Sequence, residues 1–238
     1  MIVVTGDSWA CGEWDSEHGN VHGGLAEILK HNGHEVVNLA VPGTDNRTAT
    51  HNLKWFLHNN QSHNITQIIF FKSDIARQIN TPDLQRGYID FKNTIIHSFY
   101  FALAEAVQKY QVPCAIIGGS SDAFSRDWTA NAAMNYHEKL KGLTIAVPSF
   151  TNLIVNDNSN KLTFSIWREA DTETILTAIK ASSTNQDIAI LIEDLDLAQR
   201  RYNLWHHNAE FFPDGNHPNR RAHQILYEFL IQEKYLNS

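Results

Sequence analysis

Short apolar runs alternate with segments of helical periodicity along the whole chain. The apolar runs, each typical of a buried strand, cover Ile2–Thr5, Glu35–Val41, Ile65–Phe71, Pro113–Ile117 and Thr144–Val147. Segments whose apolar residues recur at the spacing of one helix face cover Gly24–Asn32, Thr44–Asn59, Thr94–Tyr110, Asp187–Trp205 and Pro218–Tyr235. Strands that alternate with helices form a parallel sheet covered on both faces. We therefore predict an α/β fold of the doubly wound type.

The chain contains no internal repeat and no linker-like tract, and α/β folds of 238 residues are often one domain. We therefore predict a single domain over residues 1–238. Lys72–Asn93 is expected to form a long connection, because Pro82 and Gly87 interrupt it. Residues 151–184 show no clear period and are interpreted as an insertion or a lid.

Composition and charge exclude several classes of protein. Hydrophobic residues make up 42% of the chain and charged residues 19%, which fits a globular protein rather than a disordered one. The net charge of -7, without a basic block, disfavours nucleic acid as a partner, because phosphate binding needs a positive surface. No apolar stretch approaches the roughly 18 residues that a membrane span requires. We expect no nucleic-acid partner and no membrane span.

The cysteine content and the start of the chain predict a compartment. Cys11 and Cys114 are the only cysteines, too few for a disulfide framework. The first apolar run begins at Ile2, without the charged segment and the apolar segment that a secretory leader would place before it. We therefore expect a cytoplasmic protein with both thiols reduced.

Three residue types needed for nucleophilic catalysis occur at two places in the chain. Ser8 follows the first apolar run, and Asp214 and His217 precede the last helical segment. A serine hydroxyl needs an adjacent base to take its proton, and histidine suits that task near neutral pH. A carboxylate then fixes the imidazole tautomer. Because ligands of a parallel sheet bind at the carboxyl ends of its strands, we predict that Ser8, His217 and Asp214 form a catalytic triad there.

These stretches resemble the blocks of the GDSL/SGNH hydrolase family of esterases and lipases. Gly6-Asp7-Ser8 is similar to the first block, Asn38–Gly43 to the second, and Asp214–Pro218 to the last. The resemblance implies a three-layer α/β/α sandwich of the flavodoxin-like kind, with a central parallel sheet of about five strands. It also implies ester hydrolysis with Ser8 as nucleophile, backbone N–H groups of Ser8 and Gly43 in the oxyanion hole, and no cofactor.

The third block of that family is altered in this chain. Where the family has Gly-x-Asn-Asp, the chain reads Phe-Lys-Ser-Asp over residues 71–74, so that Ser73 replaces the asparagine that donates to the oxyanion. Losing one such donor typically costs about 10²–10³ in turnover. Ser73 is predicted to be a weak third donor, and Asn46 a further donor or substrate contact. Arg77 is a candidate contact for an anionic substrate, although a solvated surface arginine fits its position equally well.

Other residues near these blocks have simpler interpretations. Asp7 is expected to cap the turn that presents Ser8. Cys11 is interpreted as a structural thiol rather than a rival nucleophile. The pair His206-His207 has no partner at the spacing of metal ligands, so no metal site is predicted.

Aromatic residues flank both halves of the predicted triad. Trp9 and Trp14 both follow Ser8 closely in the sequence, where they suit stacking on a sugar ring, lining an acyl pocket or packing the first loop. Phe211 and Phe212 precede Asp214 and are expected to pack the catalytic loop against the core.

The favoured function is therefore that of a serine hydrolase acting on a small-molecule or glycan ester. A short acyl group, such as an O-acetyl group on a carbohydrate, is the preferred substrate. The alternatives are a lipase or thioesterase, an enzyme that transfers the acyl group to another acceptor, and a non-catalytic binding or structural protein that retains the fold.

Overall fold

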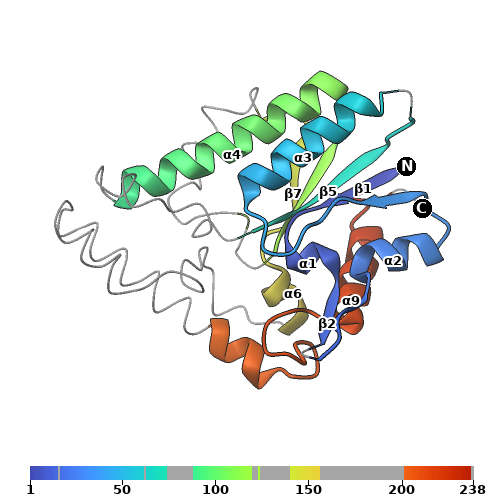
Figure 1. Cartoon of the computed structure of the whole chain (residues 1–238), viewed down its shortest axis with the longest axis vertical. Coiled ribbons are helices and arrows are strands. Elements are labelled where there is room, and N and C mark those ends of the chain that lie inside the picture. Colours follow the sequence, from blue (N-terminus) through green and yellow to red (C-terminus); the bar gives the residue numbers. More distant parts are fainter. Residues whose placement is uncertain are drawn as a thin grey trace.

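Five parallel strands form the central sheet of the computed structural model, in the order β4-β1-β5-β6-β7 (Figure 1). Their bounds are Val36–Asn38 for β4, Ile2–Thr5 for β1, Gln67–Lys72 for β5, Cys114–Gly118 for β6 and Leu143–Val147 for β7. The structure describes residues 1–15, 17–61, 63–73, 88–119, 123, 140–155 and 201–236. The predicted parallel sheet is thus confirmed.

Helices cover both faces of this sheet (Figure 1). One face carries α2 (Gly24–His31) and α9 (Arg220–Gln232), which contact each other, and the other carries α3 (Asn46–Asn59) and α4 (Tyr88–Tyr110). Because both faces are covered, the central strands read as continuous apolar runs rather than alternating ones. The architecture is the expected three-layer α/β/α sandwich.

Side chains of β5 alternate between the two cores. Ile69 and Phe71 belong to the cluster that α9 and α2 complete with Leu226, whereas Phe70 points to the opposite face and lies 5.2 Å from the Phe99 ring of α4. This two-sided burial leaves the strand ends as the place where polar groups reach the surface.

The boundaries of several elements differ from the sequence prediction. The last helix begins at Arg220 rather than Pro218, because the side chain of Asn219 caps it by accepting from the backbone N–H of Ala222. The helix predicted to begin at Thr94 begins instead at Tyr88, so the end of the expected connection is helical. Residues 74–87 of that connection lie outside the described residues.

The regions predicted least clearly are described in part. Residues 151–155 lie in α6 (Phe150–Val155), and 156–184 of the expected insertion lie outside the described residues. Of the helix predicted over Asp187–Trp205, the structure describes 201–207 as helical. No helix in the described ranges has both the length and the apolar character needed to cross a membrane.

Two elements next to the first block were not predicted. A one-turn helix α1 (Ser8–Cys11) follows β1, and an antiparallel hairpin of β2 (Glu13–Asp15) and β3 (Gly19–His22) follows α1. The hairpin leads directly into α2, and it lies at the carboxyl edge of the sheet (Figure 1).

Candidate active site

Ser8 is the first residue of α1, just past the carboxyl end of β1. The chain turns there at Gly6, whose φ is 140°, and an added Cβ would lie 2.5 Å from the carbonyl oxygen of Phe71. Asp7 is the N-cap, since its side chain accepts from the backbone N–H of Trp9 at 3.0 Å. The cap predicted for Asp7 is confirmed, and it presents a Ser8 that is 5% exposed.

Asp214 and His217 are held by a tight turn that precedes α9. Oδ1 of Asp214 accepts from the backbone N–H groups of Asn216 at 2.8 Å and His217 at 2.7 Å. Gly215 lies in this turn with a φ of 71°, and an added Cβ would lie 2.3 Å from the ring of His206. The turn therefore fixes both side chains on the same side of the loop.

The three predicted triad residues meet at the sheet edge. Nδ1 of His217 lies 2.5 Å from Oδ2 of Asp214, and its Nε2 lies 2.9 Å from Oγ of Ser8. An ionised carboxylate only accepts hydrogen bonds, so Nδ1 carries the hydrogen. That tautomer leaves the lone pair of Nε2 facing the serine hydroxyl, which is the arrangement a general base requires.

The environment of Asp214 keeps it ionised. Partial burial raises the pKa of its carboxyl group, but the hydrogen bond from the His217 imidazole and those from two backbone N–H groups outweigh burial and hold the pKa below 3.8. Both Asp214 and His217 have side chains that are 15% exposed. The site is therefore accessible but largely shielded from water.

The second-block loop lies against the first block. The backbone N–H of Val41 donates to the carbonyl oxygen of Gly6 at 3.2 Å, and that of Thr44 donates to Val41 across a turn containing Gly43. Gly43 has a φ of 74° and nothing within 4 Å of an added Cβ. The loop that contains Gly43 thus lies beside the turn that precedes Ser8, while the oxyanion role of Ser8 and Gly43 remains a prediction.

Asn46 and Ser73 are bonded to each other. Oδ1 of Asn46 accepts from the backbone N–H of Ser73 at 2.7 Å, and Nδ2 donates to the Ser73 carbonyl at 2.8 Å. Both residues are 1% exposed. Because its oxygen and one of its amide hydrogens are used in this way, Asn46 holds the loop after β5, and these contacts do not support the predicted substrate contact. Arg77 lies outside the described residues.

Most of the flanking aromatic residues form a packed cluster. The Trp9 ring is buried, with its centroid 5.2 Å from Trp205, 5.8 Å from Phe212 and 5.9 Å from Phe150. The expected packing role of Phe211 and Phe212 is confirmed, because both are buried in the core. Trp9 therefore supports the loop of the nucleophile and does not line a pocket.

Trp14 contacts both halves of the triad, which sequence reasoning did not reveal. Its indole N–H donates to the carbonyl oxygen of Ser8 at 3.0 Å, and its ring centroid lies 5.4 Å from that of His217. The only sequence signal for this contact was the presence of a tryptophan shortly after the first block.

The two cysteine thiols do not compete with Ser8 as nucleophiles. Burial, with a smaller effect of the Asp7 charge, raises the pKa of the Cys11 thiol to about 12, so it is not a thiolate nucleophile. Burial also raises the pKa of Cys114. Among the described residues, no group of three histidine, cysteine or acidic side chains has the geometry of a metal site.

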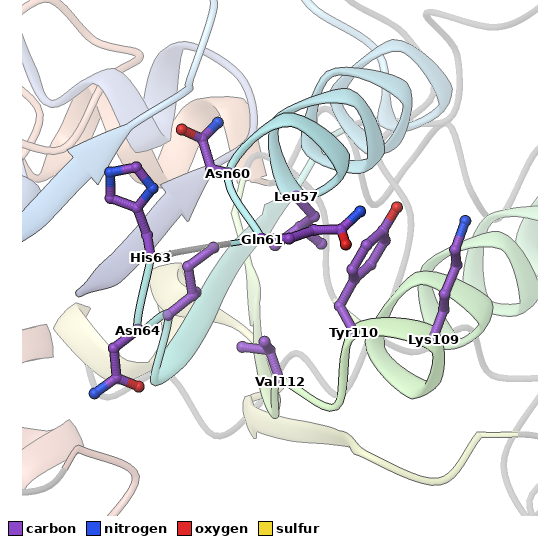
Figure 2. Close-up of a pocket in the computed structure, with 9 residues that line it drawn as sticks. Leu57, Asn60, Gln61, His63, Asn64, Lys109, Tyr110 and Val112 are labelled. Atoms are coloured by element: carbon purple, nitrogen blue, oxygen red, sulfur yellow. The ribbon is translucent and has the colours of Figure 1, made fainter.

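Two cavities are formed by residues away from the triad. One, of about 290 Å³, lies between the carboxyl-terminal ends of α3 and α4 and is lined by polar side chains including Gln61, His63 and Tyr110 (Figure 2). The other, of about 420 Å³, lies between the same helices beside Arg47 and Phe99. Neither contains a triad residue, so neither is assigned to the reaction.

Comparisons with known proteins give weak likenesses. No family model and no curated protein matches the chain. Among solved structures the chain is similar to TesA, with 12% identity over 97% of this chain and 96% of that chain and a TM-score of 0.47. It is also similar to the psychrotrophic esterase EstA from Pseudoalteromonas sp., with 12% identity, a TM-score of 0.44, and coverage of 100% of this chain and 98% of that chain.

A third solved structure is Axe2, an acetylxylan esterase from Geobacillus stearothermophilus. It is 12% identical over 99% of this chain and 94% of that chain, with a TM-score of 0.38. At identities and TM-scores this low, the likenesses assign no activity. The fold rests on the observed sheet, and the site rests on the distances among Ser8, His217 and Asp214.

Proposed function

We propose that this chain is a serine ester hydrolase of the SGNH type, with Ser8, His217 and Asp214 as its catalytic triad. The observation that carries the proposal is the continuous chain of contacts from Asp214 Oδ2 through the His217 ring to Ser8 Oγ, at 2.5 Å and 2.9 Å. Residues separated by 209 positions meet there with the tautomer that catalysis requires.

The mechanism proceeds through an acyl-enzyme. Oγ of Ser8 attacks the ester carbonyl carbon while its proton passes to Nε2 of His217, giving a tetrahedral oxyanion. Backbone N–H groups of Ser8 and Gly43 are proposed to bind that oxyanion. The carbon–oxygen bond to the alcohol then breaks, and the alcohol takes the proton from His217. Water repeats the sequence on the acyl-enzyme, which releases the acid and restores Ser8.

We propose a short acyl ester on a carbohydrate as the substrate. The supporting observation is Trp14, a partly exposed aromatic ring beside the imidazole of His217. A flat aromatic face with its N–H already bonded offers a rigid surface against which the apolar face of a sugar ring packs. Because this ring lies 5.4 Å from the imidazole of His217, we propose that it also limits the size of the acyl group.

A binding protein without catalysis is the second candidate. The observation that favours it is Ser73, which stands in place of an amide donor and is locked to Asn46 by its backbone. In that case the triad geometry would persist while the oxyanion is bound too weakly for turnover.

Hydrolysis of a series of nitrophenyl esters separates these functions. We expect kcat/KM to be highest for acetate and to fall with butyrate and octanoate. Ser8→Ala should abolish turnover, whereas Ser98→Ala, at an exposed serine of α4, should not change it. A maximum at octanoate would favour the lipase alternative, and no hydrolysis of any ester would favour the binding protein.

A further inference from the structure

We propose that the β2–β3 hairpin is a positioning clamp that holds the two halves of the triad in register, with Trp14 and Glu13 as its positioning residues. The inference rests on the proposed function for its catalytic consequence, because it concerns the same Ser8 and His217. The clamp itself is a set of contacts that exists without a substrate.

Trp14 forms the contact between the hairpin and the reacting groups. Its indole N–H donates to the main-chain carbonyl of Ser8 at 3.0 Å, which fixes the nucleophile through its backbone and leaves Oγ free to react. Its ring lies 5.4 Å from the His217 ring with an interplanar angle of 36°. One rigid side chain therefore restrains the serine and also the face of the imidazole.

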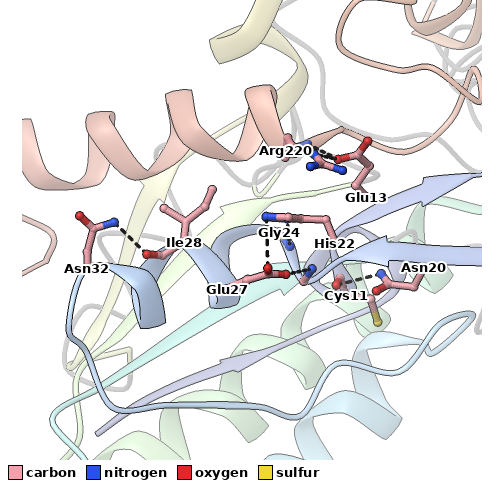
Figure 3. Close-up of polar contacts among 10 residues, drawn as sticks. Cys11, Glu13, Asn20, His22, Gly24, Glu27, Ile28, Asn32 and Arg220 are labelled. Atoms are coloured by element: carbon pink, nitrogen blue, oxygen red, sulfur yellow. Dashed lines mark hydrogen bonds and ion pairs between the residues drawn. The ribbon is translucent and has the colours of Figure 1, made fainter.

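Glu13 forms the contact between the hairpin and the start of α9. Its Oε2 accepts from the backbone N–H of Arg220 at 3.0 Å and from the Arg220 Nε at 2.7 Å (Figure 3). Arg220 is the first residue of α9, and its N–H has no partner within the helix. The Glu13 side chain is only 16% exposed, although that of Arg220 is 60% exposed. The carboxylate thus anchors the helix start that follows the catalytic loop.

The base of the hairpin is itself fixed. Nδ2 of Asn20 donates to the carbonyl oxygen of Cys11 at 3.1 Å, and the backbone N–H of Gly24 donates to Nδ1 of His22 at 3.0 Å (Figure 3). An added Cβ on Gly12 would lie 2.1 Å from the carbonyl oxygen of His22, so the chain there passes closer than a side chain would permit. These contacts tie the hairpin to α1 and α2, which gives Glu13 and Trp14 a rigid support.

The chemistry of a triad explains why such a clamp matters. A displacement of about 1 Å between reacting groups can cost about 10²-fold in rate. Ser8 and His217 are 209 residues apart in the sequence, and the contact between them is a single hydrogen bond of 2.9 Å. The hairpin supplies further restraints on each side of that bond, at Ser8 O and at Arg220 N.

The test uses Trp14→Phe, which keeps a ring but removes the N–H, and Glu13→Ala, which removes the acceptor. On nitrophenyl acetate, which has no sugar ring to pack against Trp14, Trp14→Phe should lower kcat about threefold to tenfold with KM unchanged, the loss expected for one hydrogen bond. Glu13→Ala should lower kcat by about tenfold. Glu13→Gln should restore most of that loss, because its amide oxygen still accepts from the Arg220 N–H. Trp55→Phe, at a tryptophan of α3 that is 65% exposed, is the control and should leave kcat unchanged.

Proton NMR of the protein without substrate makes the clamp testable apart from catalysis. The His217 Nδ1 proton, bonded to Asp214, should give a low-field signal that shifts or broadens in Trp14→Phe and in Glu13→Ala, but not in Trp55→Phe. An unchanged signal in both variants would overturn the clamp, whatever the activity. Wild-type protein that hydrolyses no ester, while its variants show the expected shift, would overturn the proposed function and leave the clamp standing.

Discussion

Two loops at the same edge of the sheet use their polar atoms in opposite ways. In the loop before α9, the side chain of Asp214 contacts the His217 ring, and that ring contacts Oγ of Ser8. In the loop after β5, the backbone N–H and carbonyl of Ser73 bond to the side chain of Asn46, the first residue of α3, at 2.7 Å and 2.8 Å. The polar groups of the first loop are those proposed for proton transfer, whereas those of the second hold the loop in place.

The difference indicates which half of the proposed chemistry is complete. The proton-transfer half has its nucleophile, base and carboxylate within hydrogen-bonding distance of one another. Stabilisation of the oxyanion is usually the larger contribution to catalysis, and here its proposed donors are the backbone N–H groups of Ser8 and Gly43. We therefore expect the oxyanion side, rather than the general base, to limit the rate.

The largest effect should come from the first loop. Asp214→Asn leaves the shape of the turn but reverses the tautomer preference of His217, because an amide nitrogen now faces Nδ1. We expect kcat to fall by about 10⁴, as is typical when this carboxylate is replaced in a triad. Steady-state kinetics on the best nitrophenyl ester provides the measurement. A loss of less than about tenfold would mean that Asp214 does not orient the base.

Asp214→Asn should also change how the free energy of unfolding depends on pH. The folded-state pKa of Asp214 lies below 3.8, so its charge contributes stability that is fully present above that value. This contribution is lost as the pH falls through the lower folded-state pKa. The difference in unfolding free energy between wild type and Asp214→Asn should therefore be constant above pH 3.8 and shrink below it.

An intermediate effect should come from the second loop. Asn46→Ala leaves the buried N–H and carbonyl of Ser73 without their amide partner, which should cost about 1–3 kcal/mol of stability and lower kcat by displacing the loop. Ser73→Ala retains the backbone bonds to Asn46 and should change kcat by less than about threefold. Chemical denaturation and kinetics measured on both variants separate the two effects. A large loss of kcat in Ser73→Ala with full stability would make Ser73 an oxyanion donor.

The converse substitution at the loop after β5 introduces an amide side chain. Ser73→Asn restores the residue that the resemblance would place there. It should raise kcat if the added amide reaches the oxyanion, and lower stability if the buried site has no room for it. Unchanged kcat in a stably folded variant would show that the second loop contributes nothing to the rate.

The smallest effect on kcat concerns a buried histidine that packs between α9 and β5. His223 of α9 is fully buried, its ring centroid lies 6.1 Å from that of Phe71, and neither ring nitrogen has a hydrogen-bond partner among the described residues. Burial, with a smaller effect of His22, lowers the pKa of His223 to about 3. Between pH 6.5 and about 3 the unfolded chain therefore binds more protons than the folded one, and stability falls as the pH falls.

His223→Leu removes this part of the acid sensitivity. Its unfolding free energy should decline less steeply than that of the wild type below pH 6.5, by at most about 1.4 kcal/mol per pH unit. Thermal or urea unfolding at several pH values tests this. Equal slopes for the two proteins would mean that His223 is not held neutral by burial.

The strands could be predicted because their burial leaves a direct mark on the sequence. Ile2–Thr5 and Gln67–Lys72 lie between two helical layers, and such strands are apolar on both sides. The candidate triad could be predicted because Ser8 closely follows an apolar strand, and because Asp214 and His217 stand three residues apart just before the last helix. Both kinds of signal are local in the sequence.

The hairpin and the Asn46–Ser73 pair could not be predicted for the opposite reason. Strands of three and four residues such as Glu13–Asp15 and Gly19–His22 are too short and polar to show a period. Their position depends on contacts with α2 and α9, and Asn46 meets Ser73 across 27 residues of sequence. Nothing near either residue distinguishes a structural amide from a substrate-binding one.

Labelling with a fluorophosphonate probe, followed by mass mapping of the modified peptide, tests the nucleophile most directly. We predict one adduct, on Ser8, that is absent in Ser8→Ala and strongly reduced in His217→Ala. An unmodified Ser8, under conditions that fully label a known serine esterase, would contradict the assignment of this edge of the sheet to ester hydrolysis.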